Sequence, residues 1–364
     1  MKKVLLINPI LYTAENDTRK LTSIQDTLLV TVCKGFLEIG YEPVLLADEY
    51  YRPVNEEYFG FEIIYFKHRL RKIFKPSKMP LPIGLISYLR KNHQNFDFII
   101  TSEAFSWYSL IASIMCPDKT IIWQELAIHN KMLNGYASKV WYGIMVRLFM
   151  KKIVIAPRSE KAKQFIKLYC NRVDKDIYQH PIDIDKFKVK ETKEKYFISI
   201  SQLVPRKNVD KIIHCFSDFF LNNSDYSLLI CGDGEKKEEL MKMAEESVAC
   251  NRIRFLGQIG HSELGKLLAG SQGLLIYTDK DNSILTISES IACATPILTT
   301  TVPDNSVYVS YNKCGIVKND WDDRDMSELV SNNEFYIRNC LDARKKLTAK
   351  YLANEFDKLF KRIK

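Results

Sequence analysis

The sequence lacks the usual marks of a metalloprotein, a disulfide-stabilised secreted protein and a membrane-spanning protein. Its six histidines are dispersed, so they form no metal-binding cluster. Its nine cysteines include no C-x-x-C pair, and their odd number favours reduced thiols in the cytosol. The first apolar run, residues 4–7, is too short for a signal peptide. Arg147, Lys151 and Lys152 interrupt the best candidate for a membrane span, residues 140–156.

Acidic residues are absent from residues 63 to 96. This absence adds to the net charge of +9, which is concentrated in the first half of the chain. Aromatic and apolar side chains are interleaved with the cations there, and this pattern suits an anionic membrane surface. A solvated helix that packs one face on its own domain would give the same pattern. No nucleic-acid-binding motif accompanies the charge, so we expect no nucleic-acid partner. The cations are Lys67, Arg69, Arg71, Lys72, Lys75, Lys78, Arg90 and Lys91.

What the sequence does contain is a regular alternation of strand and helix patterns over 364 residues, which predicts two α/β domains with parallel sheets. The expected strands are residues 3–8, 42–47, 97–101, 120–123, 153–156, 176–179, 196–201, 227–231, 253–256, 273–277, 296–300 and 315–317. The expected helices are residues 23–40, 107–116, 136–150, 159–169, 208–221, 236–250, 261–270 and 341–364.

The stretch DNSILTISESIACATP, residues 281–296, is the central feature of the second half of the chain. An apolar strand precedes it, a short helix pattern runs through it, and Pro296 ends that helix and opens another strand. The loop therefore lies at the carboxyl end of a strand and at the amino end of a helix, where parallel α/β folds bind phosphate ligands. Asp281 and Glu289 flank the helix start.

Four landmarks in this half occur in the order found in one enzyme family. They are QHPIDIDKF at 179–187, ISISQLVPRKN at 198–208, LICGDG at 229–234 and ESIACATP at 289–296. Together they resemble the retaining GT-B glycosyltransferases of family 4 (group 1). The resemblance implies two Rossmann-like doubly wound domains that face a central cleft. It places an acceptor-binding domain at residues 1–185, a nucleotide-sugar-binding domain at 186–345, and a C-terminal helix, 346–364, that packs back toward the first domain.

The resemblance also implies roles for individual residues. The leaving nucleotide diphosphate gains negative charge, so cations and helix-end amides must face it. Lys207 matches the phosphate-binding lysine, Glu289 the glutamate that holds the ribose, and Asp281 the acid that holds hydroxyls of the donor sugar. Those three are the expected catalytic residues. The expected nucleotide-sugar contacts are Arg206, Lys207, Gly232, Gly257, Ile259, Ile284, Leu285 and Glu289. The co-substrate would be a UDP- or GDP-sugar, with no further cofactor and no metal.

The chain departs from the family pattern in three places. The first acid is Asp281 where the family usually has Glu, and Ser201-Gln202 replaces Gly-Arg, so Arg206 would have to supply the missing cation. Residues 8–21 contain no glycine, so the glycine-rich loop after the first strand is absent. The family's first-domain histidine has no obvious match. Gln124, Glu125 and His129 stand near its place, and each of them is more simply a structural residue.

Other interpretations remain open. Glu289 fits a capping box with Thr286, in which it would only cap the amino end of its helix. Asp279 and Asp281 form a D-x-D pair like the metal-binding motif of the other glycosyltransferase fold. Gly232 and Gly234 would also suit a simple turn.

The expected function is sugar transfer from a nucleotide-diphosphate sugar to a saccharide acceptor, lipid-linked and used in bacterial surface polysaccharide or glycan biosynthesis. The enzyme would be cytoplasmic, or peripheral at the inner face of the cell membrane. The alternatives are a nucleotide-sugar epimerase or hydrolase on the same fold, or a degenerate binding protein without catalysis.

Overall fold

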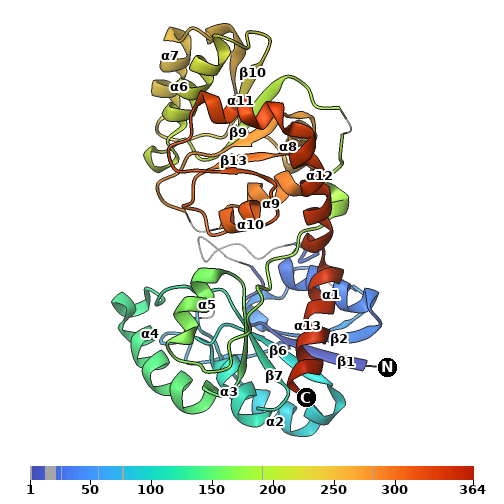
Figure 1. Cartoon of the computed structure of the whole chain (residues 1–364). Coiled ribbons are helices and arrows are strands. Elements are labelled where there is room, and N and C mark those ends of the chain that lie inside the picture. The colour runs from blue at the N-terminus through green and yellow to red at the C-terminus, as the bar shows by residue number, and fades with distance from the viewer. Residues whose placement is uncertain are drawn as a thin grey trace. The chain divides into compact units, whose positions relative to one another are not determined.

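The computed structural model describes residues 2–12, 22–25, 27–55, 57–75, 78–190, 192–281 and 283–364 (Figure 1). The chain forms two compact units, the first made of Met1–Ile182 with Thr348–Lys364 and the second of Asp183–Leu347. We expected the domains to meet after residues 185 and 345. Most of the glycine-free stretch, residues 13–21, lies outside the described residues.

The first unit contains a parallel six-stranded sheet in the order β3-β2-β1-β6-β7-β8. The strand order reverses between β1 and β6, as in doubly wound dinucleotide-binding folds. Helices cover both faces of the sheet, so the central strands are buried on both faces. Their sequences are accordingly near-continuous apolar runs. The strands are β1 Lys2–Ile7, β2 Tyr41–Asp48, β3 Glu62–Phe66, β6 Phe98–Ser102, β7 Thr120–Gln124 and β8 Val154–Pro157.

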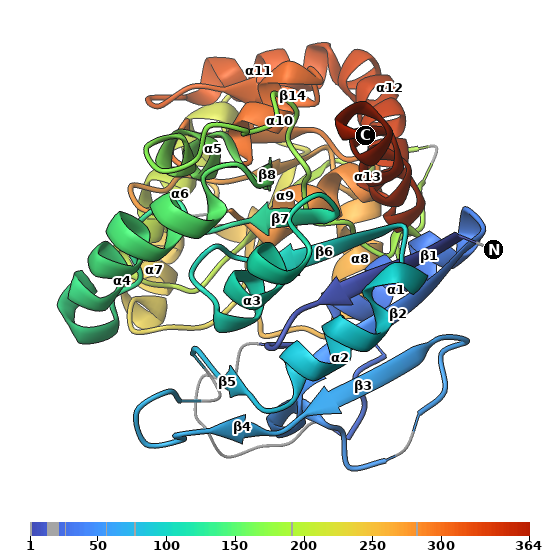
Figure 2. The same ribbon diagram turned by 90° about the horizontal axis from the view of Figure 1, so that it is seen from below.

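Helices α2 and α3 lie side by side against one face of this sheet (Figure 2). The helix α4, its π-helical continuation η4 and α5 pack on the strands at the β7–β8 side. Helices α1 and α13 cover the opposite face. The helices are α1 Leu28–Glu38, α2 Leu85–Asn92, α3 Trp107–Met115, α4 Tyr136–Trp141, η4 Tyr142–Met150, α5 Glu160–Lys167 and α13 Ala349–Ile363.

The C-terminal helix α13 packs closely on α1. A Cβ at Gly35 would lie 2.4 Å from the carbonyl carbon of Ala349, so only glycine allows the two backbones to approach this far. Phe360 stacks on Phe98 with ring centroids 4.8 Å apart, and Asp357 accepts a hydrogen bond of 2.6 Å from the Tyr41 hydroxyl. The last helix of the sequence therefore completes the core of the first sheet.

One expected strand of the first unit does not form. Residues 176–179 form no strand, and only an isolated bridge between Ile155 and Val173 precedes them. The acid-free stretch, residues 63–96, contributes most of β3, a two-stranded hairpin of β4 (His68–Arg69) and β5 (Leu81–Pro82), and α2, none of which was among the elements expected from the sequence. The apolar side chain of Phe66 faces the core. At least one of the interleaved aromatics, Phe66, therefore belongs to a buried part of a strand.

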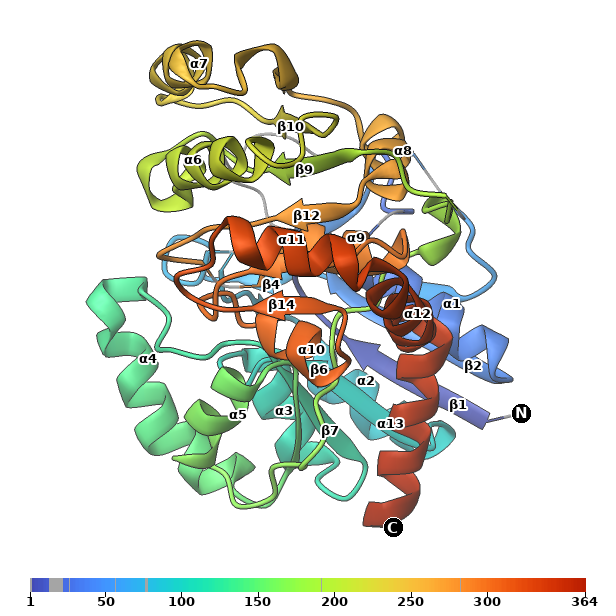
Figure 3. The same ribbon diagram turned by 45° about the horizontal axis from the view of Figure 1, so that its top comes forward.

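The second unit repeats the same topology in the order β11-β10-β9-β12-β13-β14, again all parallel. Helices α6, α7 and α11 share one core with the sheet, and Figure 3 shows α11 crossing in front of it. On the other side, α9 contacts both α8 and α12. The strands are β9 Tyr196–Ile200, β10 Ser227–Cys231, β11 Ile253–Gly257, β12 Gly273–Leu275, β13 Ile297–Thr299 and β14 Gly315–Val317.

Helices α6, α8 and α9 lie close to the expected positions and α7 ends four residues early, whereas α10, α11 and the first part of α12 were not expected from the sequence. The helix expected at residues 341–364 is divided into α12, a short 3-10 turn and α13, because Thr348 accepts a hydrogen bond from the Tyr351 N–H and starts a new helix. The helices are α6 Val209–Phe220, α7 Lys237–Glu246, α8 His261–Gly270, α9 Leu285–Ala292, α10 Ser306–Tyr311, α11 Asp323–Ser331 and α12 Asn333–Arg344. None of the helices in the described ranges combines the length and apolar character needed to cross a bilayer.

Candidate active site

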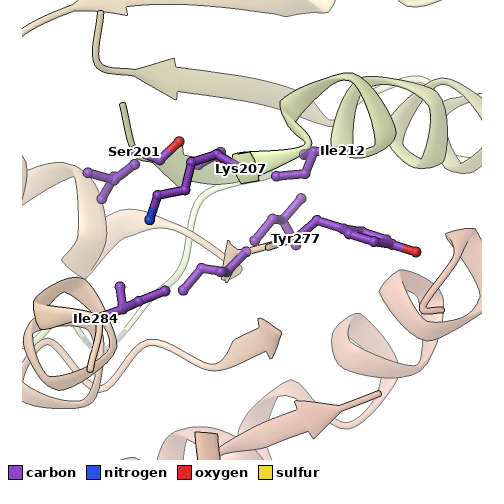
Figure 4. Close-up of a pocket in the computed structure, with 9 residues that line it drawn as sticks. Ser201, Lys207, Ile212, Tyr277 and Ile284 are labelled. Atoms are coloured by element: carbon purple, nitrogen blue, oxygen red, sulfur yellow. The ribbon is translucent and has the colours of Figure 1, made fainter. Parts of the chain in front are cut away.

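A pocket in the second unit lies between the carboxyl ends of β9 and β12 (Figure 4). These two strands are neighbours, and the strand order reverses between them. Doubly wound sheets bind ligands at this switch point. The Lys207 side chain extends into the space between the end of β9 and Ile284 (Figure 4). The lining residues are Ser199, Ile200, Ser201, Lys207, Ile212, Leu275, Ile276, Tyr277 and Ile284.

Lys207 is positioned by the turn that connects β9 to α6. Pro205 starts a single 3-10 turn, Pro205–Lys207, and Asn208 takes the left-handed conformation with φ of 41° before α6 begins. Asparagine tolerates this conformation better than most residues. The side chain of Lys207 is only 12% exposed. The sequence PRKN therefore places a nearly buried ammonium group at the amino end of a helix.

Asp281 joins this lysine and its neighbour into one charged cluster. Its carboxylate accepts hydrogen bonds from Lys207 Nζ at 2.7 Å, Arg206 Nη1 at 3.0 Å and the Thr278 hydroxyl at 2.8 Å. Partial burial alone would raise the pKa of Asp281, but the hydrogen bonds from Lys207 and Thr278 and the two positive charges bring it below its ordinary value. The cluster carries two cations and one anion, so it has a net positive charge, and Lys207 brings it to the lining of the pocket.

Arg206 lies beside Gln202. Its Nη2 is 3.5 Å from Oε1 of Gln202, the residue that replaces the family's arginine. The backbone oxygen of Arg206 accepts a hydrogen bond from the Asp279 N–H at 3.0 Å, and the Thr278 hydroxyl oxygen lies 3.0 Å from it. The loops that follow β9 and β12 are therefore tied together at this point, and the guanidinium spans both.

Gly232 allows the loops after β9 and β10 to touch. Its φ is +133°, and a Cβ would lie 1.8 Å from the Ser201 carbonyl oxygen. Its N–H donates to the Gly257 oxygen at 2.8 Å, which connects the end of β11 as well. Gly257, with φ of +67°, has open space around its Cβ position, and Ile259 is half-buried two residues later. Gly232 therefore shapes the rim of the sheet by close backbone contact.

Glu289 is 3% exposed and lies within α9. The capping-box interpretation is wrong, because α9 starts at Leu285 with Ile284 as its N-cap, and no side chain caps it. The Ile284 N–H donates to Oδ1 of Asn305 at 3.0 Å, and the Asn305 amide donates back to the Ile284 oxygen at 2.7 Å. Leu285, the first residue of the helix, is 57% exposed. The amino end of α9 is thus held by Asn305.

A second polar cluster lies in the first unit, at the carboxyl ends of β6, β7 and β8. Arg158 directly follows β8 and is 92% buried, with its guanidinium 3.6 Å from the Trp123 ring centroid. Its Nη1 lies 2.6 Å from Oε2 of Glu125 and 2.7 Å from Nε2 of His180. Partial burial would raise the pKa of Glu125, but His180 and the Arg158 charge lower it to about 2. A buried cation therefore holds an exposed carboxylate and an imidazole at one sheet edge.

Glu103 completes this cluster in an unusual backbone conformation. Its φ is 62°, which is rare for a non-glycine residue and is common at functional sites. The carboxylate accepts hydrogen bonds from the N–H groups of Glu125 at 2.8 Å and Leu126 at 3.1 Å. Burial, against the opposing charge of Arg158, raises the pKa of Glu103 to about 7.

Two of the first-domain candidates have structural roles. Gln124 is fully buried, accepts the Ala104 N–H at 2.9 Å and donates to the Leu126 oxygen at 3.0 Å. His129 lies between the hydroxyls of Ser138 and Tyr169, at 3.1 and 3.2 Å. Only Glu125, among the three residues considered from the sequence, presents its charge at the sheet edge.

Sequence reasoning missed Glu103 and Arg158. A usable signal exists, because each is the first residue after a parallel strand, as Glu125 is. The D-x-D interpretation of Asp279 and Asp281 is disfavoured by geometry, since Asp281 is already engaged by two cations while Asp279 is exposed. Within the ranges that the structure describes, no three His, Cys, Asp or Glu side chains are grouped to hold a metal ion.

The fold and this site define a GT-B glycosyltransferase architecture, with two Rossmann-like domains of parallel sheet. Residues 182–333 match the family model described as glycosyl transferases group 1. The match covers most of the second unit, and Lys207, Asp281 and Glu289 lie within it.

Several known proteins are similar to the chain in sequence or in fold. It is 24% identical to alpha-monoglucosyldiacylglycerol synthase of Streptococcus pneumoniae over 42% of its own length and 39% of that protein. It is 22% identical to the O-antigen chain mannosyltransferase RfbU of Salmonella typhimurium over 47% of its length and 48% of that protein. These matches span less than half of either relative. The crystal structure of HepE from Anabaena in complex with UDP superposes over all of both chains, with 11% identity and a TM-score of 0.62.

Proposed function

We propose that the protein is a retaining glycosyltransferase of family 4 that moves a sugar from a nucleotide-diphosphate sugar to a lipid-linked saccharide acceptor. The observation that carries the proposal is the cluster of Lys207, Arg206 and Asp281 beside the switch-point pocket. Cleavage of a sugar–phosphate bond leaves added negative charge on the diphosphate. A preorganised net positive charge at that place stabilises the transition state.

Lys207 and Arg206 would hold the diphosphate, and Asp281 would orient both cations before the donor binds. The expected contact of Asp281 with hydroxyls of the donor sugar requires that its carboxylate exchange at least one cation for the ligand. Phosphate oxygens are strong acceptors for an ammonium or guanidinium group, so they compete well for Lys207 and Arg206. In this mechanism donor binding itself would free Asp281 to hold the sugar.

Glu289 would accept hydrogen bonds from the ribose hydroxyls, and Gly257 and Ile259 would border the base. The phosphate oxygen of the leaving group would assist deprotonation of the acceptor, so no separate base is required. HepE binds UDP according to its crystal structure, which supports a uridine nucleotide as the first donor to test.

The acceptor side is supported by the first unit and by the relatives. Glu125 and His180 are exposed at the sheet edge and are held by the buried Arg158, an arrangement that suits hydrogen bonding to sugar hydroxyls. The names of the two curated relatives refer to a glycosyldiacylglycerol and to O-antigen. Both would suit an enzyme that works on surface glycolipids or polysaccharides.

The test is a panel of UDP- and GDP-sugars incubated with the protein and a bacterial membrane fraction. We expect radiolabel transfer from one donor to lipid-extractable material, with the anomeric configuration of the donor retained in the product by NMR. Glu289→Ala and Lys207→Ala should each lower transfer by at least tenfold. Transfer that is unchanged in Glu289→Ala would contradict the proposal.

An acceptor-free control separates the alternatives. Free sugar released at the full rate without membranes would identify a hydrolase, and a changed sugar stereocentre would identify an epimerase. Calorimetry that detects no binding of any nucleoside diphosphate would favour a non-catalytic binding protein.

A further inference from the structure

Helix α4 and its continuation η4, residues 136–150, expose a row of large apolar side chains. Tyr136, Val140, Ile144 and Leu148 are 72%, 57%, 50% and 70% exposed. They follow one another at intervals of four residues, and residues four apart lie on the same face of a helix. The opposite face, with Trp141, Tyr142, Val146 and Met150, is buried in the first unit. The helix is therefore apolar on both faces, and one apolar face has no protein cover in the part of the chain that is described.

Cations surround this row and acids are absent from it. No aspartate or glutamate occurs between Glu125 and Glu160, while Lys131, Lys139, Arg147, Lys151 and Lys152 are all present and exposed. A solvated helix of a soluble protein normally mixes both signs of charge. A surface with exposed cations and no acids over this length is suited to a negatively charged partner.

The hairpin tip between β4 and β5 adds to the same surface. Leu70 and Ile73 are 56% and 66% exposed and alternate with the exposed cations Arg69, Arg71 and Lys72. The tip is connected to the helix by three rings: Phe74 contacts Trp107 at 5.4 Å between centroids, and Trp107 contacts Trp141 at 4.8 Å. Figure 2 shows α4 and the β4–β5 hairpin on the same side of the first unit. Two segments whose nearest ends are 63 residues apart thus each expose apolar side chains among cations on this side of the first unit.

We propose that this surface, formed by residues 69–73 and 136–152, docks on an anionic lipid bilayer. Exposed aliphatic and aromatic side chains enter the boundary between headgroups and acyl chains, and the flanking cations pair with lipid phosphates. A protein partner would need a matching apolar groove with acidic borders, whereas an anionic bilayer offers both features without further fitting. The surface goes beyond the proposed sugar transfer, since vesicle binding needs neither donor nor acceptor.

The test is cosedimentation of the full chain with large unilamellar vesicles. Vesicles of phosphatidylcholine with phosphatidylglycerol should bind the protein, and vesicles of phosphatidylcholine alone should bind it at least tenfold more weakly. Ile144→Glu and Leu148→Glu should each reduce partitioning at least tenfold. Replacing Lys151 and Lys152 together by alanine should reduce it about 25-fold at low salt, because each surface cation contributes about fivefold.

Leu221→Glu is the matched control, because Leu221 is 66% exposed but lies in the second unit. It should leave partitioning unchanged. Circular dichroism checks that the variants fold, which is expected because the replaced side chains are exposed. The proposal is overturned by any of three results: no binding to either vesicle, equal binding by Leu148→Glu and wild type, or a dimer in solution that Leu148→Glu dissociates. Loss of sugar transfer with vesicle binding intact would count against the proposed function alone.

Discussion

The ammonium group of Lys207 lies 2.7 Å from the carboxylate of Asp281, which follows a different strand 74 residues later. The pair is nearly buried, with side-chain exposures of 12% and 14%. Ion pairs at the surface stabilise proteins little, but this pair is enclosed and shares its carboxylate with Arg206. Its main consequence is positional, because it holds two cations at the mouth of a pocket before any ligand arrives.

The first prediction separates the two members of this pair. Lys207→Ala should weaken UDP binding by about 10- to 100-fold, since hydrogen bonds between charged groups contribute about 1.5–3 kcal/mol. Asp281→Asn should leave UDP affinity the same or higher, because it frees both cations, and should lower turnover. Isothermal titration calorimetry measures both variants. Lys242→Ala, an exposed lysine on α7, serves as the control and should bind as wild type does. Equal losses of affinity in both site variants would mean that the pair acts only as a structural clamp.

Gly232 provides a stability test of the sheet edge. Gly232→Ala should lower the free energy of unfolding by about 2–4 kcal/mol, because the new Cβ would meet the Ser201 oxygen and because φ is positive. Gly260→Ala has open space and an ordinary φ of −71°, so it should change stability by less than about 0.5 kcal/mol. Denaturant unfolding of the two variants compares them directly. A stable Gly232→Ala would show that the loops after β9 and β10 can separate.

Gly35 tests the docking of the C-terminal helix. Gly35→Ala should destabilise the first unit by about 1–3 kcal/mol, since the backbone of Ala349 occupies the space that a Cβ needs. Hydrogen exchange should then increase first in α13, Ala349–Ile363. Gly143→Ala, also within a helix but with open space, should be neutral or stabilise by up to about 1 kcal/mol. Exchange that rises equally throughout the first unit would contradict a local effect on α13.

The pH dependence of stability tests the Glu103 environment. Burial raises the pKa of Glu103 to about 7 in the folded protein, from an ordinary value of 4.5. Between these values the folded state retains a proton that the unfolded state releases, so the contribution of Glu103 to stability falls as pH rises from about 4.5 to 7. Glu103→Gln removes this titration. The melting temperature of wild type relative to Glu103→Gln should therefore decrease across that interval and stay constant above it. A constant difference at all pH values would show that Glu103 titrates normally.

Much of the architecture was predictable because strand and helix periods are local properties. Strands β10 and β14 and helix α8 have the bounds expected from the sequence, and the other expected elements that form differ mostly by a few residues, but β3, the β4–β5 hairpin, α2, α10 and α11 were not expected. Local patterns failed where burial depends on distant partners. The interleaved aromatics and cations of residues 63–96 suited either a membrane surface or a solvated helix, but β2 pairs with β3 and takes part of that stretch into the sheet. The helix at the C-terminus looked continuous, and its interruption at Thr348 depends on a cap that the apolar period does not show.

The candidate site, like the fold, was predictable from the sequence only in part. The sequence by itself determined which residues follow which strands, and in a parallel sheet that is enough to bring Lys207 and Asp281 to one edge. Only the tertiary structure decided that the two are paired, that Arg206 lies beside Gln202, and that Glu289 does not cap its helix. The burial of Arg158 and the exposure of the apolar row of α4 and η4 were likewise decided by the tertiary structure. The physical reason is that spacing along the chain reports the face and end of each element, whereas ion pairing and exposure depend on what packs against that face.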